Sequence, residues 1–150
     1  MSVAQNEKAV RFRALHEGPG VFVIPNPWDV SSARVLAGLG FHALATSSAA
    51  SAAALGRRDG GLPREEALAR ARLIVDATDL PVSADLEEGF GDAPEVVAET
   101  IRLAAGAGLV GCTIEDATGN QDSPLTMSAW LSKGSLQPRK PYVHSGFLLS

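Results

Sequence analysis

Short apolar runs alternate with amphipathic helical segments along this chain, and no other feature limits its possible folds so strongly. The apolar runs cover Val21–Pro25, Phe41–Thr46, Leu80–Asp85 and Leu109–Asp116, and we expect each to form a strand. Helical patterns lie between them, so each of the first three strands is followed by a helix. Strands and helices that alternate in this way form parallel β-α-β units, either in a doubly wound sheet or in a barrel. The predicted fold class is therefore α/β.

Four helices are expected from spacing and capping signals. The first spans Asn6–Glu17, and the second begins near Asp29 and ends at two glycines. The third begins at Pro63, which suits the first turn of a helix. The fourth has the pattern of a capping box, in which Asp92 would cap the helix and Glu95 would reach back to it.

The turn after the first predicted strand favours the barrel. A dinucleotide-binding sheet needs a G-x-G-x-x-G turn there, and the sequence NPWDVSSA contains no glycine. A complete (β/α)8 barrel takes on the order of 250 residues and eight strands. The 150 residues of this chain supply four predicted strands, so we expect an incomplete TIM barrel with about the first four β/α units.

Charge and composition exclude several classes of function. The chain has 13 basic and 17 acidic residues, a net charge of −4, which gives no electrostatic footprint for nucleic acid or anionic lipid. Its one cysteine, Cys112, excludes an internal disulfide framework and is interpreted as a packing residue. The first residues lack the apolar core of a signal peptide, and no window approaches the roughly 18 apolar residues of a membrane span. We expect a cytoplasmic protein that acts on a small molecule.

Polar side chains follow all four predicted strands at their carboxyl ends. In barrels and doubly wound sheets alike, these ends meet on one face, where catalytic and binding groups gather. Each residue also has a structural interpretation, because Asp29 could simply cap a helix and the serines could start one. The residues are Asn26 and Asp29 after the first strand, Ser47 and Ser48 after the second, Asp85, Glu87 and Glu88 after the third, and Glu115 and Asp116 after the fourth.

Asp85 and Glu115 are the strongest candidates for a metal site. An unpaired carboxylate at the end of an apolar strand is costly to desolvate, so a positive partner should lie between them. Oxygen ligands without a histidine or cysteine cluster favour Mg²⁺ or Mn²⁺ over zinc. Because Mg²⁺ takes one or two carboxylates and keeps several waters, the remaining acids would act through water. A chance acidic rim is the alternative.

Three segments together resemble a known enzyme family. They read IPNPWDVSSARVLAGLGFHALATSSAASAAALGRRDGG, LPVSADLEEGFGDAPEVVAETIRLAAGAG and VGCTIEDATG. They resemble the isocitrate lyase / phosphoenolpyruvate mutase superfamily, in particular its carboxyphosphonoenolpyruvate phosphonomutase-like or oxaloacetate-decarboxylase-like branch. The resemblance runs from about Val10 to Leu125. Its most specific part is a D-x-[DE]-x-G-[FY]-G segment combined with a later I-E-D.

The resemblance implies a metal site with three acidic residues. Asp85 would bind Mg²⁺ (or Mn²⁺) directly, while Glu87 and Glu115 would hold the waters of the metal. The cation would act as Lewis acid and template for a developing enolate oxygen.

The resemblance also implies where the substrate binds. Ser47 and Ser48 would hold the carboxylate and oxo group of a small 2-oxo acid, and Asn26 and Asp29 are further substrate-binding candidates. Asp59 would lie near the substrate, in a mobile gating loop that covers residues 49–61. Ser47 and Asp59 are the residues expected to take part in catalysis.

The implied chemistry makes or breaks a C–C or P–C bond beside a 2-oxo acid, through its enolate. The isocitrate and methylisocitrate lyases carry a K-[KR]-C-G-H loop where this chain reads ATGNQDSPL. We therefore set those two activities aside and favour decarboxylation or hydrolysis of an oxaloacetate-like substrate, or phosphonate chemistry. A full-length member of the family is expected to be a homo-oligomer.

The sequence changes character after residue 125. We expect residues 1–125 to form the N-terminal half of the barrel and residues 126–150 to form an irregular tail, from a frame change or an aberrant end. The fourth strand would then lack a partner, and the short chain would not be a competent enzyme. A non-catalytic truncated relative that binds metal or a partner protein is the alternative.

Overall fold

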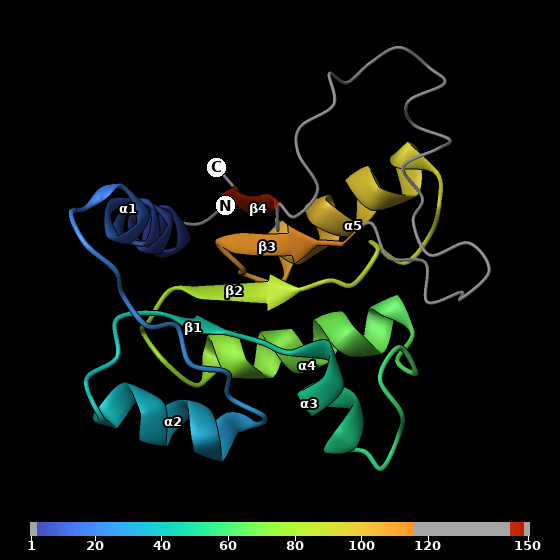
Figure 1. Ribbon diagram of the computed structural model, residues 1–150, viewed down its shortest axis with the longest axis horizontal. Coiled ribbons are helices and arrows are strands. Elements are labelled where there is room, and N and C mark those ends of the chain that lie inside the picture. Colours follow the sequence, from blue (N-terminus) through green and yellow to red (C-terminus); the bar gives the residue numbers. More distant parts are fainter. Residues whose placement is uncertain (1–2, 116–144, 149–150) are drawn as a thin grey trace.

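The computed structural model describes residues 3–115 and 145–148, which form one four-stranded sheet with helices around it (Figure 1). The strands are β1 (Leu44–Ala45), β2 (Val82–Asp85), β3 (Gly111–Ile114) and β4 (Ser145–Leu148), and they lie in that order. β1, β2 and β3 are parallel, and β4 is antiparallel to β3. Parallel strands joined through helices confirm the predicted α/β class.

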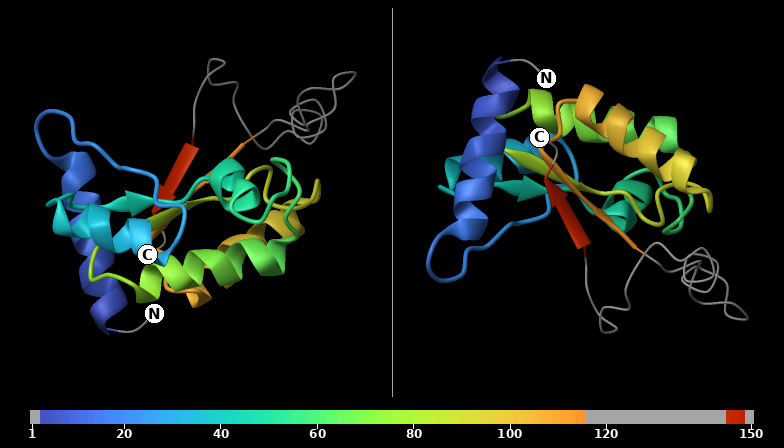
Figure 2. Two further views of the ribbon diagram at one scale, coloured as in Figure 1. Left: turned by 90° about the horizontal axis from the view of Figure 1, so that it is seen from below. Right: turned by 90° about the horizontal axis from the view of Figure 1, so that it is seen from above.

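The helices described are α1 (Val3–Glu17), α2 (Val30–Gly38), α3 (Ser48–Ala53), α4 (Arg64–Asp76) and α5 (Pro94–Gly106). All except α3 lie where the spacing predicted them. Figures 1 and 2 show α1 beside the amino ends of β2 and β3, and α3 beside the carboxyl ends of the strands. The loops at the end near α3 therefore carry the predicted polar residues.

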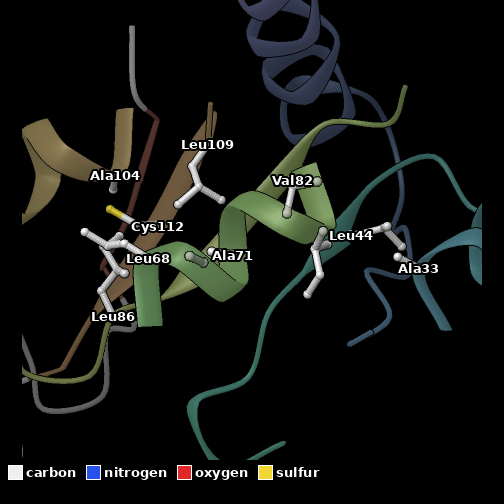
Figure 3. Packing of buried hydrophobic residues seen from close by; sticks show 11 residues of the cluster. Ala33, Leu44, Leu68, Ala71, Val82, Leu86, Ala104, Leu109 and Cys112 are labelled. Carbon is white, nitrogen blue, oxygen red and sulfur yellow. The ribbon is translucent and has the colours of Figure 1, made fainter. Parts of the chain in front are cut away.

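The main core lies between the sheet and helices α2, α4 and α5. Leu68 of α4 lies beside Leu86 and Cys112 in Figure 3, and all three are buried members of one cluster that also holds Val82 and Leu109. Burying a leucine or valine stabilises the fold by roughly 1.5–3 kcal/mol each. Cys112 belongs to this cluster, and burial raises the pKa of its thiol to about 11. Both observations fit a packing residue better than a nucleophile.

A smaller cluster holds α1 against the sheet. Phe12, Ala43 and Val110 are its buried members, and Phe22 and Ile24 pack against them. A Cβ added at Gly111 would lie only 2.7 Å from Cε1 of Phe12, so the phenyl ring approaches the β3 backbone directly. The glycine is therefore what lets α1 approach this end of the sheet.

The segment Val21–Pro25 is not a strand, and that prediction is wrong. Among the described residues, one backbone hydrogen bond joins this segment to a strand: the Ala45 amide donates to the Pro25 carbonyl, at 3.1 Å. Val21 is fully exposed and Val23 is 68% exposed, so the segment is not buried on both faces. A ladder needs amide donors, and two prolines within three residues, Pro25 and Pro27, remove them.

Two further local predictions need correction. Asp92 does not cap α5, because Ala93 occupies the cap position, no side chain caps the helix and Pro94 stands in its first turn. Part of the predicted loop 49–61 is helix α3, in which Ala50, Ser51 and Ala52 are buried. Residues 53–61 of this stretch are exposed.

The expected tail contains one described element, β4, which pairs along the whole of β3 from Gly111 opposite Leu148 to Ile114 opposite Ser145. The expectation that β3 lacks a partner is therefore wrong. Residues 116–144, 149 and 150 lie outside the described residues, and with them Asp116 and the rest of the predicted tail. None of the helices in the described part combines the length and the apolar character that a membrane crossing requires.

Candidate metal centre

Asp85 is the last residue of β2, and its carboxylate is fixed by three hydrogen bonds. The Ser48 amide and hydroxyl both donate to Oδ2, at 3.1 and 2.8 Å, and the Glu87 amide donates to Oδ1 at 3.1 Å. Side chain and donors are half-buried, so water competes only partly for these bonds. The strand end and the start of α3 therefore hold one carboxylate in a defined orientation.

Further carboxylates surround Asp85 at this end of the sheet. The Glu115 amide donates to the Glu87 carbonyl at 2.7 Å, which continues the contact between β2 and β3 beyond both strands. Burial, followed by the negative charges of Glu88, Asp59, Asp85 and Glu115, raises the pKa of Glu87 to about 7. The negative charges of these four carboxyl groups therefore all act on Glu87.

The donor set suits a hard cation that keeps part of its water. Among residues 3–115 and 145–148, no three His, Cys, Asp or Glu side chains are placed to hold a metal ion between them alone. Mg²⁺ does not need such a cage, because it binds one or two carboxylates and keeps several waters. The oxygen ligands therefore fit Mg²⁺ or Mn²⁺, with Asp85 as the oriented ligand.

The raised pKa of Glu87 predicts how stability changes with pH in metal-free buffer. The pKa of Glu87 is about 7 in the folded protein, above its ordinary value of 4.5, so the folded protein binds this proton more tightly than the unfolded chain does. The contribution of Glu87 to stability therefore falls as the pH rises between these two pKa values. Glu87→Gln removes that loss. We expect the melting temperature of this variant to exceed the wild-type value more at about pH 8 than at about pH 5. An equal difference at both pH values, measured by thermal unfolding with EDTA present, would contradict the assignment.

Ser47 and Asp59 lie in the loops next to the acidic cluster. Ser47 caps α3, where its hydroxyl oxygen accepts a hydrogen bond from the Ala50 amide at 3.3 Å. No contact found in the described residues takes the Ser47 hydroxyl hydrogen, which leaves it as a donor. Asp59 is exposed and accepts from the Gly60 amide at 3.1 Å, and its charge reaches Glu87.

The two candidates after the first predicted strand are engaged in the scaffold. Asn26 donates through Nδ2 to the Ala45 carbonyl at 2.9 Å, which ties its segment to β1. Asp29 caps α2 in a capping box with Ser32, and the bonds from Ser32 lower the pKa of the Asp29 carboxyl. No described contact joins either side chain to the cluster around Asp85. Their local roles are structural.

Sequence reasoning missed a strained turn at the centre of the site. Glu87 and Phe90 have φ angles of 51° and 63°, in the left-handed region of the backbone that residues other than glycine rarely adopt. Strain of this kind concentrates at functional sites and persists where the surroundings enforce it. The glycines of GFG were the available signal, because Gly89 also has a positive φ of 88° and continues the left-handed turn.

An open cavity of about 660 Å³ lies beside the cluster, between the starts of α4 and α5. Among residues 3–115 and 145–148, Glu87 is the one metal-site candidate that lines it, and Arg64 is the one basic lining residue. The other charged lining groups are Glu65, Glu88, Glu95 and Glu99. These acidic groups would repel a small anion from the cavity.

Comparison with known proteins decides the family. The model of the family "Phosphoenolpyruvate phosphomutase" matches residues 12–134. The chain belongs to this family. The match confirms the resemblance noted from the sequence motifs, and it covers every candidate site residue.

The relatives of this family member include named enzymes. This chain is 35% identical to a Corynebacterium glutamicum protein named "Probable 2-methylisocitrate lyase 2". The 116 aligned residues cover 77% of this chain and 38% of that protein. A Burkholderia cenocepacia crystal structure with a provisional lyase/mutase assignment shares 57% identity and a TM-score of 0.80, over 83% of this chain and 44% of that one. The structure of oxaloacetate acetylhydrolase with the product oxalate shares 28% identity and a TM-score of 0.68 with this chain, over 78% of this chain and 42% of that one. The chain thus spans less than half the length of each of these relatives.

Proposed function

We propose that this chain carries the metal-binding part of an active site for Mg²⁺- or Mn²⁺-dependent lyase or mutase chemistry on a small 2-oxo acid. One observation carries the proposal: Asp85 is held in a fixed orientation at the carboxyl ends of β2 and β3, where its negative charge and those of three further carboxylates act on Glu87. Such a group is costly without a cation. The named relatives support the substrate class, because they act on small organic acids.

We infer that the sheet is the first part of a (β/α)8 barrel. The order β1, β2, β3 with parallel pairing is that of consecutive barrel strands. The segment ending at Pro25 lies next to β1, where a preceding strand would lie. In such a barrel the chemistry gathers at the carboxyl ends, where these acids are found.

In the proposed site each side chain has a defined task. Asp85 would bind the cation directly, while Glu87 and Glu115 would orient its waters. Ser47 donates its hydroxyl hydrogen to an oxygen of the substrate, and Asp59 approaches from the exposed segment 53–61, which closes over the site. The cation supplies Lewis acidity that favours the enolate of the 2-oxo acid.

The choice of reaction rests on the sequence of residues 117–125. ATGNQDSPL lacks the catalytic cysteine of the isocitrate and methylisocitrate lyases, although one relative is named for the second activity. Hydrolysis or decarboxylation of an oxaloacetate-like acid, or phosphonate chemistry, therefore remains the proposal.

Oxalate tests the proposal, because it is a small dicarboxylate that can bind beside the cation. We expect oxalate to raise the melting temperature of the chain with Mg²⁺ present and not with EDTA. Ser47→Ala should weaken the oxalate effect and leave Mg²⁺ binding intact, which separates substrate binding from metal binding. A stabilisation by oxalate that persists in EDTA would contradict the proposal.

A further inference from the structure

Ser48 gives both of its hydrogen-bond donors to the same oxygen of Asp85. Its amide and hydroxyl lie 3.1 and 2.8 Å from Oδ2, whereas Oδ1 accepts the Glu87 amide at 3.1 Å. A carboxylate oxygen accepts about two hydrogen bonds, one for each lone pair. Oδ2 is therefore filled, and Oδ1 keeps one acceptor position for a further ligand.

The position of Ser48 is set by the fold. It is the first residue of α3, and that short helix is anchored by Ala50 and Ala52, which are 8% and 1% exposed. The hydrogen bond from the Ser48 amide to Oδ2 would survive a change of side chain. The shorter hydrogen bond from the Ser48 hydroxyl would be lost. The hydroxyl thus decides whether Oδ2 has a lone pair to offer.

We propose that the Ser48 hydroxyl determines metal specificity by restricting Asp85 to binding a cation through Oδ1 alone. The inference rests on the function proposed above. Ca²⁺ takes roughly six to eight oxygen ligands and often uses both oxygens of a carboxylate, whereas Mg²⁺ keeps its waters and needs fewer protein oxygens. A carboxylate with one blocked oxygen therefore disfavours Ca²⁺ more than Mg²⁺ or Mn²⁺.

Calorimetric titration with Mg²⁺ alone and with Ca²⁺ alone tests the proposal on the full chain and two variants. In Ser48→Ala we expect the affinity for Ca²⁺ to rise about tenfold relative to that for Mg²⁺, the factor that a charge-assisted hydrogen bond is worth. Ser48→Thr keeps a hydroxyl on the same carbon and should keep the wild-type ratio. Circular dichroism establishes that each variant is folded.

Three outcomes would overturn the inference. An unchanged ratio in folded Ser48→Ala would show that the hydroxyl does not set specificity, while the proposed metal site would stand. A ratio in Ser48→Thr that matches Ser48→Ala would assign the effect to side-chain packing instead. Binding of neither ion by the wild-type chain would remove the proposed metal site together with this inference.

Discussion

Asp85→Ala is expected to abolish Mg²⁺ binding, with a loss of affinity greater than about 100-fold. Groups that only orient a metal ligand are worth roughly 10- to 100-fold in affinity, so removal of the ligand itself should cost more. Both carboxylate oxygens of Asp85 accept hydrogen bonds, which fixes the side chain in advance of metal binding. Calorimetric titration with Mg²⁺ measures the loss.

Glu88→Ala is the matched control for this substitution. Glu88 lies three residues away, adds negative charge to the same region and lines the neighbouring cavity. A purely electrostatic attraction would make the two substitutions equally harmful. We expect Glu88→Ala to leave Mg²⁺ affinity nearly intact, and equal losses would show that Asp85 is not the ligand.

Gly89→Ala should destabilise the fold by about 2–4 kcal/mol, from backbone strain and overpacking together. Gly89 has a φ of +88°, and a Cβ there would lie 2.9 Å from Cγ2 of Val97 on α5. The residue is also held by neighbours, since its amide donates to the Leu86 carbonyl at 2.9 Å and its carbonyl accepts from the Thr100 hydroxyl at 2.8 Å. The turn therefore has little room to relax. Urea unfolding of the variant and the wild type gives the difference in free energy.

Gly106→Ala provides the opposite expectation from the same type of substitution. Gly106 ends α5, its φ is not positive, and nothing lies within 4 Å of an added Cβ. Alanine at a helical position stabilises by roughly 0.5–1 kcal/mol relative to glycine. If Gly89→Ala were as harmless as Gly106→Ala, the left-handed turn at the metal centre would not be a constrained feature.

Local sequence patterns predicted the elements whose stability is local. α4 appears where Pro63 and the first-turn glutamates indicate a helix start, and Ala71 and Ile74 of its predicted stripe are buried. Asp29 caps α2 because its side chain needs only the amide three residues ahead. The carboxyl ends of parallel strands meet at one edge of a sheet, so the strand pattern alone also predicted that Asp85 and Glu115 lie at the same edge.

Features that depend on distant partners could not be read locally. Val21–Pro25 has the composition of a strand, but a strand also requires neighbours, and one hydrogen bond to β1 is what the described residues provide. β4 arises from pairing with β3, more than 30 residues earlier in the chain, which no periodicity reports. α3 lies in the stretch that the resemblance predicts as a gating loop, although alanine is the best helix former and Ser47 caps the helix.

The contact between Ser48 and Asp85 shows the same limit within the site. The two residues are 37 positions apart, and both were predicted to be functional, one for substrate and one for metal. Only the fold shows that the hydroxyl of the first is used by the carboxylate of the second. Residue type predicted membership of the site, while the division of tasks required the three-dimensional arrangement.

Anomalous diffraction from crystals grown with Mn²⁺ tests the central claim most directly, because it locates the cation without reference to activity. We predict a single strong peak in direct contact with Oδ1 of Asp85, with Glu87 and Glu115 reaching it through waters. A peak bound elsewhere, for example among the glutamates of the neighbouring cavity, or no peak at all near Asp85, would contradict the account.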